Sequence, residues 1–287
     1  MYMKNIFSIK LILVIPFLIG TYLFLTAFTV VDKCGYVTDN PNIAPVSLES
    51  SSWVEKELST LSLREKIGQF FMIAAYSGKG ESHLSQIDSL VMNQKVGGII
   101  FFEGQRNNLI SSIDRFQKGA KTPLLIGMDA EWGVQMRLLG EESFPYNYTL
   151  GAANDPELTQ RISEMIAQEC RELGVHINFA PVADVNSNPK NPVIGFRSYG
   201  ENPKTVARHV EAAVKGMESQ GVLTSIKHFP GHGDTDTDSH LELPIVRNTY
   251  AQINAVDFFP FRSGIRAGAS SVMIGHLNVP ALDPSGT

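Results

Sequence analysis

Three histidines, three aspartates and a lysine lie within residues 227–240, which read KHFPGHGDTDTDSH. The proline and two glycines of this stretch indicate that a strand ends here and an irregular loop begins. Asp238 stands two residues before His240, so its carboxylate could fix the orientation and tautomer of the ring and stabilise the protonated form. Because imidazole titrates near neutrality, His240 could give a proton to a leaving oxygen and later take one from water. The pattern favours acid/base catalysis.

A metal site is the competing interpretation of the same loop. Asp234 begins an alternation of aspartates like the start of a calcium loop, but Ser239 and Ile245 stand where an EF-hand needs glycine and glutamate. The three histidines could bind a transition metal, but their spacing matches no familiar ligand pattern. We therefore expect neither a metal nor another cofactor.

The elements that must position this loop alternate along the chain. Short apolar runs predict strands at 70–73, 96–102, 124–129, 175–179, 222–226 and 271–274. Capping and stop signals predict helices that start at Ser62 and that span 155–174, 202–221 and 250–267. Strands separated by helices are typical of an α/β fold with a parallel sheet.

Polar residues follow four of the predicted strands, and this favours a barrel over an open sheet. They are Asp129, Asp184, the pair Lys227 and His228, and His276. In a (β/α)8 TIM-type barrel the active site is built at the carboxyl ends of the strands and from the loops that follow. Six strands do not close an eight-stranded barrel, so either two strands are not recognised or the chain stops before the last ones.

The 227–240 stretch resembles the signature of family 3 glycoside hydrolases, specifically the β-N-acetylglucosaminidase branch. Lys-His-Phe-Pro-Gly-His-Gly followed by Asp-Ser-His is specific to that branch, and the resemblance runs from about Trp53 to Asp283. It implies a (β/α)8-type barrel and a retaining mechanism. It also implies that His240 is the general acid/base and that Asp238 is its partner.

The resemblance also implies contacts to a terminal N-acetylglucosamine. Segments 129–137 and 193–199, together with the start of the 227–240 stretch, are similar to the family's sugar-binding segments. The residues implied as sugar contacts are Asp129, Arg137, Arg197, Lys227 and His228. Trp132 stands at the second position of the family's Glu-Gly-Gly, a departure that moves neither the aspartate nor the final arginine of its segment. Segment 178–184 also matches, and we interpret it as structural.

Other interpretations of these residues stay open. Asp129 and Asp184 could cap the helices that follow them. Arg137 and Arg197 could form surface ion pairs, since most arginines are exposed.

The retaining mechanism needs a carboxylate nucleophile. In the family it is an aspartate after a later strand, whereas Asp283 belongs to the loop before it and this chain ends at Thr287. We therefore expect a fragment with little activity alone. The expected function is removal of terminal non-reducing β-linked N-acetylglucosamine, with peptidoglycan-derived saccharides as the source. The alternative is a non-catalytic sugar-binding module of the same fold.

The N-terminus predicts export. Lys4 and Lys10 precede the uncharged segment 11–31, whose 21 residues would span about 31 Å as a helix, enough for a bilayer core of about 30 Å. We expect a signal peptide or membrane anchor over 1–34, a linker over 35–52, and a barrel domain over 53–287. The domain would be periplasmic or extracellular, whether or not 11–31 keeps it anchored.

Composition narrows the remaining classes. A hydrophobic content of 43% excludes a disordered chain, and two cysteines in 287 residues make no disulfide scaffold. The net charge is −5, of which the first 34 residues contribute +2, which leaves −7 for the remainder. That part has no basic stripe, so we expect no nucleic-acid partner. We expect a monomer that contacts a membrane only through its N-terminal segment.

Overall fold

The computed structural model describes residues 52–237 and 242–285. They belong to a compact unit formed by Val46–Thr287. The predicted signal or anchor over 1–34 and residues 35–51 of the predicted linker lie outside the described residues. Within the described part, the helices are all too short or too polar to span a bilayer.

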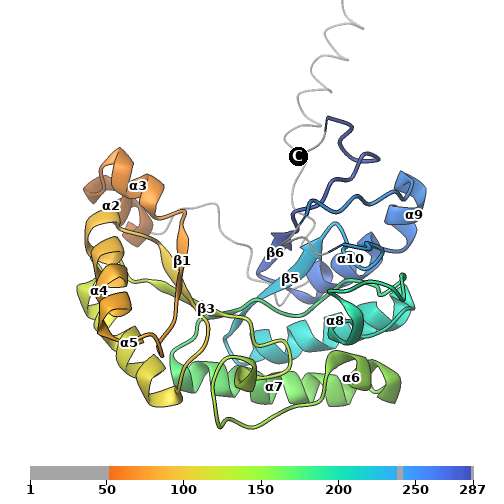
Figure 1. Ribbon diagram of the computed structural model, residues 1–287, viewed down its shortest axis with the longest axis horizontal. Helices are drawn as coiled ribbons and strands as arrows, with labels where there is room; N and C mark the ends of the chain where they lie inside the picture. The colour runs from red at the N-terminus through yellow and green to blue at the C-terminus, as the bar shows by residue number, and fades with distance from the viewer. Residues whose placement is uncertain (1–51, 238–241, 286–287) are drawn as a thin grey trace, which may run out of the picture. The chain divides into compact units, whose positions relative to one another are not determined.

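Six parallel strands form one sheet whose spatial order is the chain order, β1 to β6 (Figure 1). Their bounds are β1 Met72–Ala75, β2 Gly98–Phe101, β3 Leu125–Met128, β4 Ile177–Asn178, β5 Leu223–Phe229 and β6 Ser271–Ile274. The predicted parallel α/β sheet is confirmed. Within the described residues it forms a half-barrel, with β1 and β6 at its two edges.

The helices lie along one side of this curved sheet, with α4 and α5 beside the first strands and α7, α8 and α10 beside the later ones (Figure 1). The α-helices are α2 Ser52–Thr60, α3 Leu63–Gly68, α4 Glu81–Ser89, α5 Arg106–Gly119, α6 Asn147–Ala153, α7 Pro156–Leu173, α8 Pro203–Ser219, α9 Tyr250–Ala255 and α10 Phe258–Ala267. A π-helical turn, η1 Leu90–Gln94, and two 3₁₀ turns, η2 Val134–Met136 and η3 Gly195–Arg197, complete the elements.

Three predicted helix starts are confirmed by their caps. Ser62 and Glu65 form the reciprocal capping box of α3. Asp155 accepts a hydrogen bond from the Leu158 N–H at the start of α7, and Asn202 caps α8. Each cap satisfies backbone donors that have no partner inside the helix.

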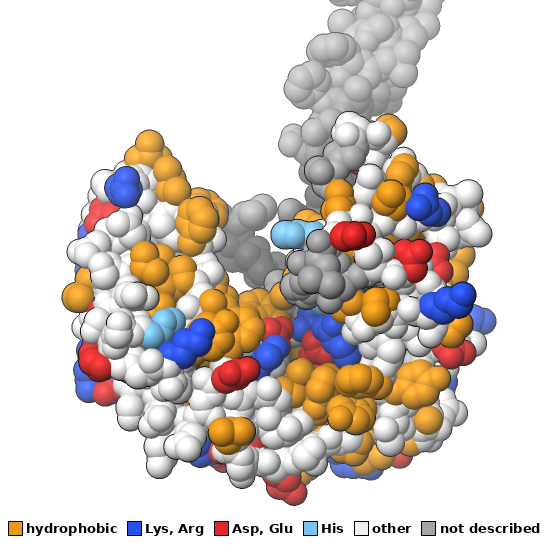
Figure 2. Space-filling model, in the orientation of Figure 1, with side chains coloured by type: hydrophobic (Ala, Val, Ile, Leu, Met, Phe, Trp, Pro, Cys, Tyr) orange, Lys and Arg blue, Asp and Glu red, His pale blue; other side chains and the backbone are white. Residues whose placement is uncertain are grey.

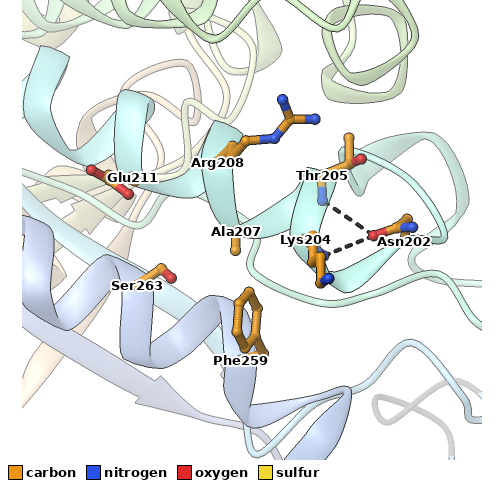
Figure 3. Close-up of a pocket in the computed structure, with 8 residues that line it drawn as sticks. All are labelled: Asn202, Lys204, Thr205, Ala207, Arg208, Glu211, Phe259 and Ser263. Carbon is orange, nitrogen blue, oxygen red and sulfur yellow. Dashed lines mark hydrogen bonds between the residues drawn. The ribbon is translucent and has the colours of Figure 1, made fainter.

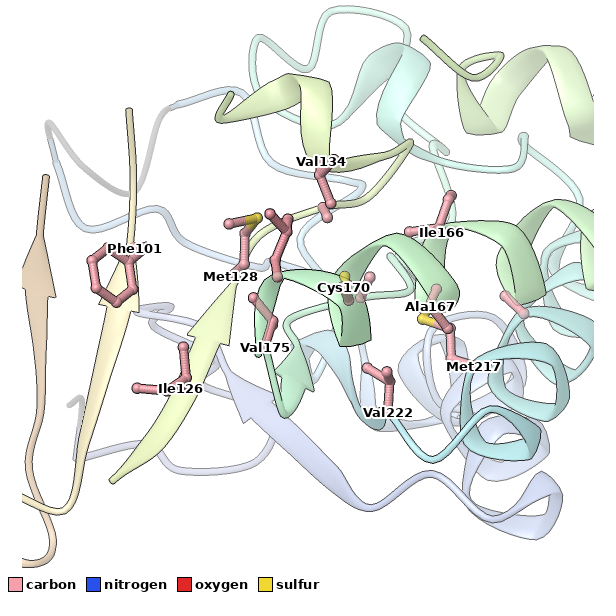
Figure 4. Close-up of a cluster of buried hydrophobic side chains, with 14 of the residues drawn as sticks. Phe101, Ile126, Met128, Val134, Ile166, Ala167, Cys170, Val175, Met217 and Val222 are labelled. Carbon is pink, nitrogen blue, oxygen red and sulfur yellow. The ribbon is translucent and has the colours of Figure 1, made fainter. Parts of the chain in front are cut away.

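The core fills the space between the sheet and its helices (Figure 4). Helix α7 buries one face in this core. The buried residues of that face recur about every three or four positions: Thr159, Ser163, Ile166, Ala167, Cys170 and Leu173. That face lies against strand residues such as Met128 and against α8, which contributes Met217. Cys170 is fully buried, and burial raises the pKa of its thiol to about 12, so it acts as a small apolar side chain.

Two sequence expectations are wrong in detail. The single helix predicted over 250–267 is two helices, α9 and α10, because Pro260 has no N–H for the Val256 carbonyl and its ring would clash with that oxygen. The strand predicted over 222–226 continues to Phe229, so Lys227 and His228 lie inside β5 and not after it.

Candidate active site

A buried lysine stands at the centre of the strand ends. Lys227 in β5 is only 2% exposed, and its Nζ lies 2.8 Å from Asp129 Oδ1 and 2.7 Å from Glu131 Oε1. Asp129 directly follows β3, so both carboxylates reach the lysine from the end of a strand that lies two places from β5 in the sheet. An ammonium group removed from water needs such partners, because burying it alone costs several kcal/mol (about 3–5).

Arg197 binds the second of these carboxylates at two points. Its Nε lies 3.0 Å from Glu131 Oε2 and its Nη2 lies 2.7 Å from Oε1. Burial alone would raise the pKa of Glu131, but Lys227 and Arg197 outweigh it and lower the pKa from 4.5 to about 2. Glu131 is therefore an ionised, charge-balanced acceptor at every physiological pH.

Arg137 completes the charged group. Its Nη2 lies 3.2 Å from Asp129 Oδ2, and its Nε donates to the Asp129 backbone carbonyl at 3.1 Å. The guanidinium also lies over the Phe102 ring, 5.0 Å from its centroid. Arg137 and Arg197 are both partly buried in the site. Neither therefore forms a surface ion pair, the alternative that the usual exposure of arginine left open.

Asp184 holds the neighbouring imidazole. It is fully buried, its Oδ2 lies 2.7 Å from His228 Nδ1, and it accepts the backbone N–H groups of His228 and His232. Burial would raise the pKa of Asp184, but His228 and these hydrogen bonds hold it below its usual value. Asp184 caps none of the described helices, so the cap interpretation is wrong; it positions His228 and the turn at His232.

All of these groups except the fully buried Asp184 line one hollow of about 510 Å³ at the carboxyl ends of the strands. Figure 2 shows positive and negative side chains gathered there, with hydrophobic side chains beside them. The lining includes all five residues that the resemblance implied as sugar contacts, Asp129, Arg137, Arg197, Lys227 and His228, and also Glu131, His232 and His276. The β5–β6 register shifts between Lys227 and Phe229, and the neighbours Lys227 and His228 both line the hollow, although neighbours in a regular strand point to opposite faces.

The predicted dyad, Asp238 and His240, lies outside the described residues. The start of its loop is firmly held: His232 Nδ1 lies 2.6 Å from Thr235 Oγ1, and Asn191 Nδ2 donates to the His232 carbonyl at 2.7 Å. Asp283, which we expected not to be the nucleophile, is exposed and is not part of the lining of the hollow.

Comparison with known proteins decides the family. The model of the glycosyl hydrolase family 3 N-terminal domain matches residues 62–286. The chain belongs to glycosyl hydrolase family 3. The predicted resemblance is confirmed.

Three relatives of this family 3 chain illustrate the similarity. Over 214 residues it is 39% identical to beta-hexosaminidase A of Pseudoalteromonas piscicida, which covers 70% of this chain and 36% of that protein. A solved family 3 beta-N-acetylglucosaminidase from Paenibacillus sp. str. FPU-7 is 39% identical with a TM-score of 0.73, over 78% of this chain and 44% of that one. NagZ from Neisseria gonorrhoeae, solved in complex with N-trifluoroacetyl-D-glucosamine, is 29% identical with a TM-score of 0.65, over 74% and 65%. The family 3 chain thus spans less than two thirds of each relative.

The sequence pattern of the family 3 chain does not mark Glu131, and it predicts a structural or capping role for Asp184. A signal for the first was present, since a lysine that continues an apolar strand run must be buried and needs nearby acids. Glu131 lies two residues from Asp129 and would have been the next acid to consider. Nothing in the sequence indicates that Asp184 accepts three hydrogen bonds from the 228–232 turn, because that contact depends on how two loops pack.

Two other observations bear on what the family 3 chain binds. Within residues 52–237 and 242–285, no group of three or more His, Cys, Asp or Glu side chains could hold a metal ion.

A second hollow of about 560 Å³ lies between the start of α8 and α10 (Figure 3). There Asn202 Oδ1 accepts the Lys204 and Thr205 N–H groups as a helix cap, and Glu211 pairs with Lys215 on the surface. This hollow shows no convergent set of buried polar groups.

Proposed function

We propose that the protein removes terminal, non-reducing, β-linked N-acetylglucosamine from saccharides with retention of configuration. The observation that carries the proposal is the charge network of Asp129, Glu131, Lys227, Arg137 and Arg197 around the 510 Å³ hollow. Three cations against two carboxylates give a rigid set of donors and acceptors. A sugar with several hydroxyl groups can exchange its water hydrogen bonds for these.

In this proposal the sugar hydroxyls donate to Asp129 and accept from Arg137, Arg197 and Lys227. His228, oriented by Asp184, contributes its Nε2 to the same hollow, 3.4 Å from Arg197 Nη2. Because each charged group is already held by a partner, its side chain loses little conformational freedom when the sugar binds. The terminal sugar is thus placed at the strand ends, next to the beginning of the catalytic loop.

The chemistry is proposed for the loop that follows. His240 gives its proton to the glycosidic oxygen as the bond breaks and then takes a proton from the attacking water, while Asp238 stabilises the imidazolium. A carboxylate nucleophile forms the glycosyl intermediate that preserves the anomeric configuration. One imidazole and one carboxylate would thereby replace the usual two carboxylates.

The setting is also part of the proposal. The names of the relatives, beta-hexosaminidase and beta-N-acetylglucosaminidase, support the sugar and the linkage. The uncharged segment 11–31 supports export to a periplasmic or extracellular location, where peptidoglycan-derived saccharides are a plentiful source of this sugar. We propose that the protein acts there as a monomer and contacts a membrane only through its N-terminal segment.

The test uses a p-nitrophenyl β-N-acetylglucosaminide. Two proteins without their first 34 residues are compared, one ending at Thr287 and one that also carries any residues its gene encodes after Thr287. We expect the extended protein to release nitrophenol and His240→Ala to lower turnover at least about 100-fold. His176→Ala is the matched control, because His176 is exposed and its Nδ1 accepts the Ile126 N–H away from the hollow.

Undiminished turnover in His240→Ala would contradict the proposed acid/base. No turnover in either protein, with N-acetylglucosamine still bound, would instead favour the non-catalytic sugar-binding module.

A further inference from the structure

Three aromatic rings form a cluster beside the charged hollow. The ring centroids of Trp132 and Tyr146 are 5.1 Å apart, those of Trp132 and Phe196 are 5.7 Å apart, and those of Tyr146 and Phe196 are 4.7 Å apart. Phe196 is 52% exposed and Tyr146 is 48% exposed. Single exposed aromatic residues are ordinary, but three rings gathered at the surface mark a binding surface more often than a packing need.

Each ring is the chain neighbour of a residue that is fixed in the site. Trp132 follows Glu131, Phe196 precedes Arg197, and the Glu131–Arg197 pair joins these two segments. Tyr146 precedes Asn147, whose side-chain amide donates to the Arg197 carbonyl at 2.8 Å. Arg197 therefore ties all three segments together. Two of the rings, Trp132 and Phe196, are each one residue along the chain from Glu131 and Arg197, which line the hollow.

We propose that this aromatic cluster, Trp132, Tyr146 and Phe196, binds the sugar ring that is linked to the terminal N-acetylglucosamine. The inference rests on the proposed function and deepens it, because it makes oligosaccharides and not single sugars the preferred ligands. A β-linked pyranose presents axial C–H groups on its faces, and these carry the slight positive charge that the negative face of an aromatic ring attracts. The cluster offers apolar faces where the hollow offers charges, so the two halves suit two successive sugar rings.

Trp132 connects this aromatic cluster to the charged residues of the site. It stands between the carboxylate that binds Lys227 and the turn that leads to Arg137. A glycine there would leave Tyr146 and Phe196 without their shared neighbour. The proposed binding surface therefore depends on Trp132.

The test measures saccharide affinity by calorimetry in the whole chain with His240→Ala, which is expected to lower turnover at least about 100-fold. The ligands are N-acetylglucosamine and its β-1,4-linked disaccharide. We expect the disaccharide to bind about tenfold tighter than the monosaccharide. Trp132→Ala should remove that gain and change monosaccharide affinity less than about twofold, whereas Trp132→Phe should keep part of it. Phe70→Ala removes another highly exposed ring and serves as the control.

The chain has two tryptophans, so Trp53→Phe leaves Trp132 as the single fluorescent reporter. Its emission should change with the disaccharide and not with the monosaccharide. The inference is wrong if both saccharides bind equally in the parent, or if Trp132→Ala weakens both equally. If the monosaccharide itself does not bind, the proposed function fails and this inference fails with it.

Discussion

Arg197 binds Glu131 through two nitrogens, and this pair is where the separate segments of the site meet. The carboxylate it binds also accepts from Lys227 of β5, and the Arg197 backbone carbonyl accepts from Asn147 at the start of α6. Glu131 itself is 4% exposed. The pair therefore holds the residues proposed to contact the sugar in place before any sugar binds.

Replacing Glu131 by glutamine tests this role. The neutral amide leaves Arg197 and Lys227 without their shared carboxylate, so we expect the free energy of unfolding to fall by about 3–5 kcal/mol in urea titrations at pH 7. Because the pKa of Glu131 falls from 4.5 in the unfolded chain to about 2 in the folded one, its contribution is present above pH 4.5 and is lost as pH falls towards 2. In Glu131→Gln the free energy of unfolding should therefore fall less between pH 4.5 and about 2 than it does in the parent.

The control for this variant is Glu211→Gln on α8. Glu211 forms an exposed pair with Lys215 one helical turn away, so its loss should cost less than about 1 kcal/mol. Equal effects of the two substitutions would show that the buried network does not hold the site.

The buried carboxyl group of Asp257 should make the free energy of unfolding depend on pH in the opposite direction. It is buried against Gly231, its Oδ2 has no hydrogen-bond partner among the described residues, and burial, followed by the charges of Asp184 and Asp234, raises its pKa from 3.8 to about 7. The folded state then binds a proton that the unfolded chain releases, so stability is lost as pH rises from 3.8 to about 7.

Asp257→Asn cannot titrate and should remove this loss. We expect the variant to exceed the parent in unfolding free energy by roughly 2–4 kcal/mol above pH 7, and the two to converge near pH 4. Asp114→Asn, an exposed change on α5, should leave the curve unchanged. A parallel pH dependence in Asp257→Asn and the parent would mean that Asp257 is ionised in the folded protein.

A substitution at Gly233 tests how closely the start of the loop before the proposed dyad packs. A Cβ at this position would lie 1.7 Å from the Val185 carbonyl oxygen, so Gly233→Ala must displace backbone. We expect about 1–3 kcal/mol of lost stability in urea titrations. Gly119→Ala is the matched control, since its Cβ would meet only Met92 Cγ at 3.8 Å; it should be neutral or stabilising by up to about 1 kcal/mol.

An unchanged unfolding free energy in Gly233→Ala would show that the loop can move away from Val185 at no cost.

Local sequence signals were sufficient for most of the fold. The Ser62 box, the Asp155 and Asn202 caps and the β-rich runs each act within a few residues, and the alternation they mark gives the parallel sheet. The break between α9 and α10 also had a local cause in Pro260. The length of β5 has no such local cause, because β5 is extended beyond Ile226 by its pairing with β6.

The site was predictable only in part, for the same reason. Motif similarity named five residues as expected sugar contacts, and the structure brings all five into the lining of one hollow. The links between them could not be read locally, since Glu131 reaches Arg197 and Lys227 across 66 and 96 positions of sequence, and Asp184 reaches His228 across 44. Such partners are chosen by packing, and sequence neighbours do not determine them.

The most direct test of the account is the affinity of the chain for N-acetylglucosamine, measured by calorimetry before and after Asp129→Asn. Asp129 contacts both Lys227 and Arg137 and is proposed to accept the sugar hydroxyls. We predict measurable binding by the parent, a loss of at least about tenfold in Asp129→Asn, and no change in Asp114→Asn. Equal affinity in the parent and Asp129→Asn, or no binding by the parent, would contradict the proposal that this charge network binds the terminal sugar.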